Sequence, residues 1–83
     1  MEKYRKLSEE EIKMGFIASC IETVAETLKV SNKEILERMD KVGLIDKYIY
    51  PSYDALHTES RENLTDNLID TLNLWENTNP NNE

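Results

Sequence analysis

The chain is short of the residues on which many functional sites depend. Its 83 residues include one cysteine, one histidine, two glycines and two prolines. A lone cysteine excludes a disulfide within the chain, and one cysteine with one histidine cannot supply the four ligands of a zinc site. Neither glycine has a partner at the spacing of a phosphate-binding loop. We therefore expect no metal and no cofactor.

Long apolar runs are missing as well. The first six residues, Met-Glu-Lys-Tyr-Arg-Lys, are mostly charged, and no following run is long enough for a secretory leader or a membrane span. This pattern predicts a cytoplasmic protein that makes no contact with a membrane.

Positive charge is scarce in the second half of the chain. Residues 1–47 hold nine Lys or Arg and ten Asp or Glu, a balance of −1, whereas residues 48–83 hold one basic and seven acidic residues, a balance of −6. Together they give the net charge of −7. The acidic half repels phosphate backbones and suits a basic partner, so nucleic acid is not the expected ligand.

What the chain does contain is helical periodicity. Ser8 and Glu11 form a capping-box pattern, and apolar residues from Ile12 to Leu28 follow at helical spacing, which predicts a helix over 8–29. Ser31 predicts the start of a second helix over 32–42, and Gly43 is suited to end it. Cys20 falls within the first apolar stripe, so we expect it to be buried.

The remainder of the chain predicts shorter and longer helical pieces. Residues 44–49 predict a short helix that Pro51 ends, and a helical turn around 53–57 is possible. A last helix is expected from Ser60 or Arg61 to about Trp75, followed by a polar tail over 76–83. The sequence thus predicts an all-α fold with a single domain over 1–75, a small bundle of three main helices plus one short helix.

One segment concentrates the distinctive residues. Residues 48–58 hold three of the four tyrosines, the single histidine and one of the two prolines. We expect Tyr48 and Ile49 to pack on the first helix, while Tyr53 and Leu56 anchor the turn. Large aromatic side chains beside a turn also suit a contact surface. The candidate interaction surface consists of Tyr50, Tyr53, Asp54 and His57.

Catalysis is not expected from these residues. His57 has an acidic neighbour three residues earlier, Asp54, which could orient the imidazole. However, no serine is placed to use this pair, and a buried Cys20 is a poor nucleophile. The sequence therefore favours a protein that is not an enzyme.

The middle of the chain allows an alternative. Two short helices in close succession, over 32–42 and 44–49, are similar in outline to a helix-turn-helix DNA-binding motif. The second of them would present Asp46 and Lys47 beside Tyr48, a weak basis for recognising DNA. A DNA-binding regulator is the alternative function, and a homodimer with Trp75 in its contact is a further possibility for so small a core.

Three motifs of this chain resemble a family of very short bacterial proteins that is known only as a domain of unknown function. The motifs read Cys20-Ile21-Glu22-x-Val24-Ala25-x-x-Leu28, Ser31-x-x-Glu34 and Gly43-Leu44-Ile45-Asp46-x-Tyr48-Ile49-x-Pro51-x-Tyr53-Asp54-x-Leu56-His57-Thr58, and the resemblance as a whole covers about residues 12–72. The family's usual glycine two residues after Thr58 is replaced here by Ser60, a departure that touches only the turn.

The resemblance implies context and no catalytic residue. Members of that family tend to be encoded beside toxin-like proteins, some of them similar to ADP-ribosyltransferases. It therefore implies an antitoxin-like or accessory role. Together with the charge pattern, this role favours a protein–protein interaction module. The resemblance further implies that its partner is a toxin-like protein encoded nearby.

Overall fold

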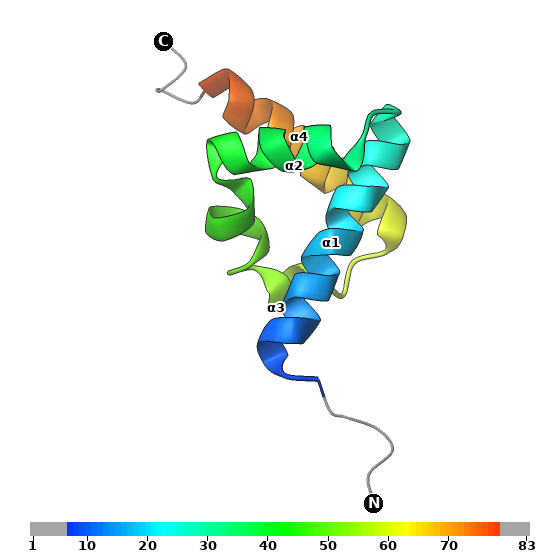
Figure 1. The fold of residues 1–83 in the computed structure, drawn as a ribbon, viewed down its shortest axis with the longest axis vertical. Coiled ribbons are helices and arrows are strands. Elements are labelled where there is room, and N and C mark those ends of the chain that lie inside the picture. Colours follow the sequence, from blue (N-terminus) through cyan, green and yellow to red (C-terminus); the bar gives the residue numbers. More distant parts are fainter. Residues whose placement is uncertain (1–6, 79–83) are drawn as a thin grey trace, which may run out of the picture.

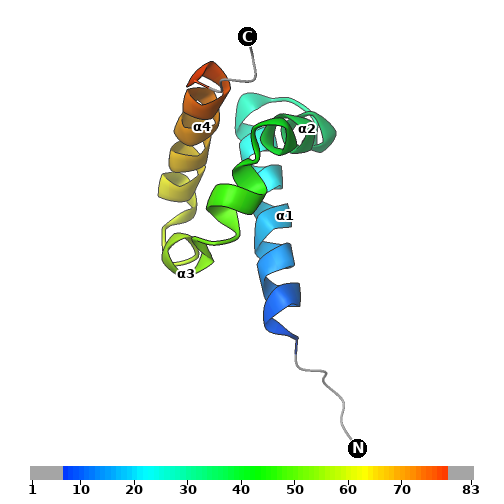
Figure 2. The same ribbon diagram turned by 90° about the vertical axis from the view of Figure 1, so that its left-hand side faces the viewer.

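The computed structural model describes residues 7–78, which form five helical segments. They are α1 (Glu9–Leu28), α2 (Asn32–Val42), the π-helical turn η1 (Ile45–Ile49), α3 (Tyr53–Leu56) and α4 (Arg61–Thr78), and the described residues contain no strand (Figure 1). The all-α prediction is confirmed, as is the small bundle with three main helices. Figure 2 shows α1 and α2 on one side of the bundle, α4 on the other with α3 below it, and η1 between the two sides.

The start of α1 follows the predicted capping box. The Ser8 hydroxyl accepts a hydrogen bond from the Glu11 N–H at 3.1 Å, and the Glu11 carboxylate accepts one from the Ser8 N–H at 2.9 Å. Together these contacts satisfy two of the free donors at the helix start. The helix ends at Lys29, which has a positive φ of 61° and closes the last turn.

The second helix also begins and ends where the sequence indicated. The Ser31 hydroxyl accepts from the Glu34 N–H at 3.0 Å, and Gly43 ends the helix with a φ of +76°. A side chain at Gly43 would be strained by that backbone angle, and its Cβ would lie 3.3 Å from the Lys47 side chain. The chain therefore turns sharply here and enters η1 without a linker.

The core lies where α1, α2 and α4 pack pairwise against one another. The first helix contributes Cys20, Val24 and Ala25, each at most 1% exposed, which confirms the expected burial of the cysteine. The remaining core residues come from α1, α2, the 44–56 segment and α4: Ile17, Ile35, Met39, Val42, Leu44, Ile49, Leu56, Leu68 and Leu72. Ile12, which the periodicity placed in the apolar stripe, is instead 43% exposed, because it lies in the first turn of α1.

The last helix is longer than the sequence indicated. It runs to Thr78, so residues 76–78 are helical. The physical reason is an ion pair in which Arg38 of α2 donates from Nε and Nη2 to the two carboxylate oxygens of Glu76, both at 2.8 Å. Two parallel charge-assisted bonds hold this turn of α4 against α2. Residues 79–83 lie outside the described part of the chain.

The turn η1 has a wider backbone than an α-helix. The Tyr50 N–H donates to the Ile45 carbonyl, five residues earlier, at 2.9 Å. A π-turn of this kind accommodates one more residue than an α-helical turn. Ile49 at its end is fully buried, so η1 is anchored in the core and carries the chain from α2 towards α3.

Candidate interaction surface

Aromatic side chains from α1, from α3 and from the residues that follow η1 and α3 meet at one corner of the bundle. The Tyr53 ring lies between Phe16, which it meets edge to face at 5.2 Å between centroids, and His57, which stacks on it at 4.5 Å. Lys13 Nζ lies 4.9 Å from the centre of the Tyr50 ring and 5.7 Å from that of Tyr53. We call Lys13, Phe16, Tyr50, Tyr53 and His57 the aromatic corner.

The structure brings three of the four candidate residues into this corner. Tyr50 and Tyr53 are half-buried and His57 is exposed, so each ring has one side against the protein and another towards solvent. Asp54 is also exposed, but the contact by which it could orient the His57 imidazole is not formed. Within residues 7–78 the His57 ring has its contact with Tyr53, and no hydrogen bond joins it to Asp54.

The first tyrosine of the block belongs to a different environment. The Tyr48 ring lies 6.1 Å from that of Trp75, and its hydroxyl donates to Asn67 Oδ1 at 3.2 Å. Both partners are on α4, so the Tyr48 ring packs on the last helix, while its packing on the first helix stays a prediction. The block from 48 to 58 therefore divides into core residues, such as Ile49 and Leu56, and the outward-facing rings of the aromatic corner.

Acidic side chains line one side of α4. Glu62, Asp66 and Asp70 are spaced by four residues and are all exposed, and Leu74, at the next such position, is 58% exposed. Residues four apart lie above one another on a helix, so these three carboxylates form a row, which we call the acidic ridge. Like charges at this spacing weaken a helix by about 0.2–0.5 kcal/mol per pair. The ridge therefore brings no stability to the isolated chain.

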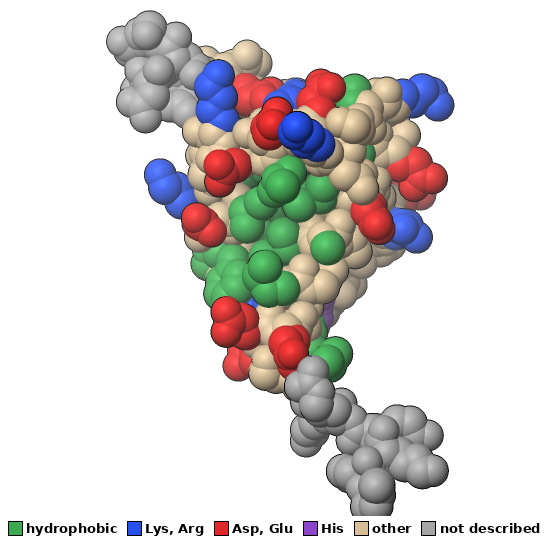
Figure 3. Space-filling view, in the orientation of Figure 1, with side chains coloured by type: hydrophobic (Ala, Val, Ile, Leu, Met, Phe, Trp, Pro, Cys, Tyr) green, Lys and Arg blue, Asp and Glu red, His purple; other side chains and the backbone are tan. Residues whose placement is uncertain are grey.

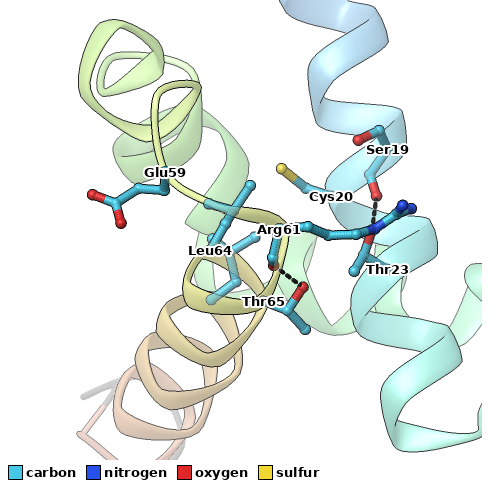
Figure 4. Close-up of a pocket in the computed structure, with 8 residues that line it drawn as sticks. Ser19, Cys20, Thr23, Glu59, Arg61, Leu64 and Thr65 are labelled. Carbon is cyan, nitrogen blue, oxygen red and sulfur yellow. Dashed lines mark hydrogen bonds between the residues drawn. The ribbon is translucent and has the colours of Figure 1, made fainter.

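A hollow of about 290 Å³ opens between α1 and the start of α4 (Figure 4). Arg61 reaches from α4 towards Ser19 and Thr23, and Thr65 lies below it. The two threonine hydroxyls each donate to a carbonyl on their own helix, Thr23 to Ser19 and Thr65 to Arg61, both at 2.7 Å. Their protons are thus used within the fold.

The thiol in this hollow is in an environment that suppresses its reactivity. Cys20 is 1% exposed, and burial raises the pKa of its thiol to about 11. At neutral pH nearly all of it is the protonated form, which is a weak nucleophile and a weak metal ligand. The Cys20 thiol is therefore not activated as a nucleophile in this hollow.

Two further features concern metals and membranes. No three of the His, Cys, Asp and Glu side chains in the described range, 7–78, lie close enough together to hold a metal ion. None of the helices in the same range is both long and apolar enough to cross a membrane.

The sequence alone did not indicate two members of the aromatic corner. Phe16 belongs to the apolar stripe of α1, and Lys13 follows three glutamates that suit the start of a helix, so both have an ordinary local explanation. Their neighbours Tyr50 and Tyr53 lie more than thirty residues away along the chain. The contact depends on the path of η1, which the periodicity of the sequence does not encode.

Comparisons with known proteins give one match. A search of the curated proteins and a search of the solved structures each returned no match. Residues 15–75 match the model of a family that is described only as a protein of unknown function, DUF3791. This range contains α2, η1, α3 and most of α1 and α4, including the aromatic corner apart from Lys13. Because the match covers more than half of the chain, the protein belongs to the DUF3791 family.

Proposed function

We propose that this protein is a non-catalytic binding module that regulates or neutralises a basic protein partner, in the manner of an antitoxin. The observation that carries the proposal is the aromatic corner, where Tyr50, Tyr53 and His57 present ring surface that the fold leaves partly uncovered. Aromatic side chains are enriched in binding hot spots because they bury much area at little cost in conformational entropy.

The charge distribution supports a basic partner. The acidic ridge adds a row of exposed carboxylates. These like charges repel one another four residues apart and so lower the stability of α4 in the unbound chain. A basic surface would remove that repulsion on binding and would speed association by long-range attraction. The resemblance to proteins encoded beside toxin-like neighbours is in keeping with such a partner.

The test uses the product of the neighbouring open reading frame as the partner. It is purified alone and titrated into the full-length chain in a calorimeter, at two salt concentrations. We expect binding that weakens at higher salt, because surface charges are screened over about 10 Å at 0.1 M salt. No heat and no co-elution at 100 μM would refute this antitoxin version of the proposal.

Variants then locate the surface. Tyr50→Ala and His57→Ala should each weaken binding at least fivefold, because they remove exposed ring surface, whereas Tyr53→Ala also removes the contact with Phe16 and so confounds folding with binding. Asp66→Asn with Asp70→Asn should reduce the salt dependence. Glu37→Gln, an exposed acid on α2, is the control and should leave binding unchanged. Equal affinity for all variants would place the contact elsewhere.

The DNA-binding alternative has less support from the geometry. A recognition helix must stand out from the protein to enter a groove. The segment in that position is η1, one five-residue turn flanked by the fully buried Leu44 and ending in the fully buried Ile49. Its exposed side chains are Asp46 and Lys47, whose charges cancel. Retardation of random duplex DNA by micromolar protein at low salt would revive this alternative.

A further inference from the structure

A shallow apolar groove runs between α1 and α2, on the side of the bundle away from α4. Ala18 and Ile21 of α1 and Leu36 of α2 form its floor, and the groove encloses about 280 Å³. Figure 3 shows hydrophobic side chains gathered between α1, α2 and η1, with charged side chains around them, and this groove lies at the edge of that area where α1 meets α2. No residue of the aromatic corner or of the acidic ridge lines this groove, so the groove remains to be explained.

Large apolar side chains at this groove are exposed to solvent, although apolar surface is more stable when it is buried. Leu36 is 46% exposed although it lies in the middle of α2, and Met14, one turn before Ala18 on α1, is 55% exposed. Gly15 is exposed in the interior of α1, where a Cβ would meet nothing within 4 Å. Small side chains at Gly15 and Ala18 leave room for another helix to approach α1 closely.

The charges at the groove identify what fits it. Its two ionisable residues are Glu22 on α1 and Lys33 on α2, one of each sign, whereas the chain as a whole carries −7. In a two-fold symmetric interface every contact occurs twice, with the two copies exchanged. Lys33 of each chain can therefore face Glu22 of the other. The patch is therefore electrically complementary to itself, and it is a place where two acidic chains can meet with little repulsion.

We propose that this face binds a second copy of the chain in a two-fold symmetric dimer, with Met14, Ala18, Ile21 and Leu36 at the centre and Glu22 paired with Lys33 across the axis. The acidic ridge lies on α4 at the other side of the bundle, so both ridges stay open to solvent (Figure 2). Trp75, the contact expected from the sequence, is half-buried against Tyr48 and is not part of this face.

The dimer is expected to be reversible. A standard interface buries about 800 Å² on each partner. The centre of this contact is four side chains of α1 and α2, so we expect the dimer to be weak. Sedimentation velocity of the full-length protein between roughly 5 and 500 μM, in low salt, should show a monomer that converts to a dimer. A single monomeric species over the whole range overturns the proposal.

Substitutions test the face itself. Leu36→Glu places a charge at the centre and should raise the dissociation constant at least tenfold, while Leu74→Glu, the matched change at an exposed leucine of α4, should leave it unchanged. Circular dichroism verifies that both variants keep their helix content. Association of Leu36→Glu that equals wild type, or loss of association in Leu74→Glu alone, overturns the assignment.

Charge reversal tests the two-fold pairing. Glu22→Lys and Lys33→Glu each create like charges across the axis and should weaken the dimer several-fold. The double variant restores the opposite charges and should recover most of the wild-type affinity. A double variant that dimerises no better than the weaker single variant would show that these residues do not pair across the axis.

Discussion

The ion pair between Arg38 and Glu76 allows a direct test of what holds α4 in place. Replacing Glu76 by glutamine keeps the size of the side chain but removes its charge and one of two charge-assisted acceptors. Exposed ion pairs are worth about 0.2–1 kcal/mol, and bidentate geometry favours the upper end of that range. Both side chains are about 30% exposed, and both hydrogen bonds are 2.8 Å long. We therefore expect Glu76→Gln to cost about 1 kcal/mol at pH 7.

The pH dependence gives the same pair a second signature. The hydrogen bonds from Arg38, its positive charge and that of Lys41 lower the pKa of the Glu76 carboxyl in the folded protein. A group whose pKa is lower in the folded state contributes stability above its unfolded pKa, about 4.3 for glutamate, and loses it as the pH falls through the folded value. The difference between wild type and Glu76→Gln should therefore be full at pH 7 and fade below about pH 4.

Thermal unfolding followed by circular dichroism measures both effects. For a chain of this size, 1 kcal/mol corresponds to a shift in Tm of about 4–8 °C. A double-mutant cycle with Arg38→Gln should give a coupling energy of about 1 kcal/mol at pH 7, and Glu37→Gln on the same helix should change stability by less than about 0.5 kcal/mol. Zero coupling, or a penalty for Glu76→Gln that is the same at pH 3, would refute the reasoning.

Three further predictions concern single side chains. Gly15→Ala should stabilise the fold by roughly 0.5–1 kcal/mol in urea unfolding, because its Cβ would meet nothing and alanine favours the helix; a loss of stability would contradict this. Cys20 should react with a disulfide reagent at pH 7 only as fast as the protein opens, and rapid labelling of native protein would show that the thiol is accessible. Tyr48→Phe removes one hydrogen bond to Asn67 Oδ1 and should lower the free energy of unfolding by about 0.5–1 kcal/mol. The loss stays small because Asn67 Oδ1 keeps a hydrogen bond from Thr71 at 3.0 Å. An unchanged Tm would mean that water replaces the lost bond.

Local chemistry explains which parts of the fold could be predicted from the sequence. Ser8, Ser31 and Gly43 act within their own turn, so the helices they start or end were placed within a residue or so. Cys20 could be assigned to the core because apolar periodicity directly reports burial. The sequence also resembled a family of unknown function, and the chain does belong to a family of that description.

Contacts between distant residues explain what could not be predicted. Glu76 is polar and sits in a polar stretch, so nothing in its own neighbourhood distinguishes a helical turn from a tail; its partner lies 38 residues earlier. The same holds for the aromatic corner, where the candidate tyrosines were found but Lys13 and Phe16 were not. The exposure of Leu36 also escapes a periodicity argument, because spacing alone does not say which apolar residues of a helix face a neighbour.

The π-helical turn at Ile45–Ile49 has a consequence for how this protein tolerates change in length. Each residue of an α-helix advances the chain by about 100° around the axis, and η1 carries one residue more than an α-helical turn would. Deleting a single residue there would leave composition and core chemistry almost intact. It would nevertheless rotate everything downstream, so that Tyr50 and Tyr53 no longer face Lys13 and Phe16. The turn thus fixes the rotation of the residues after η1 relative to those before it. A one-residue deletion, which most connections between helices would accept, should here break the contacts of the aromatic corner.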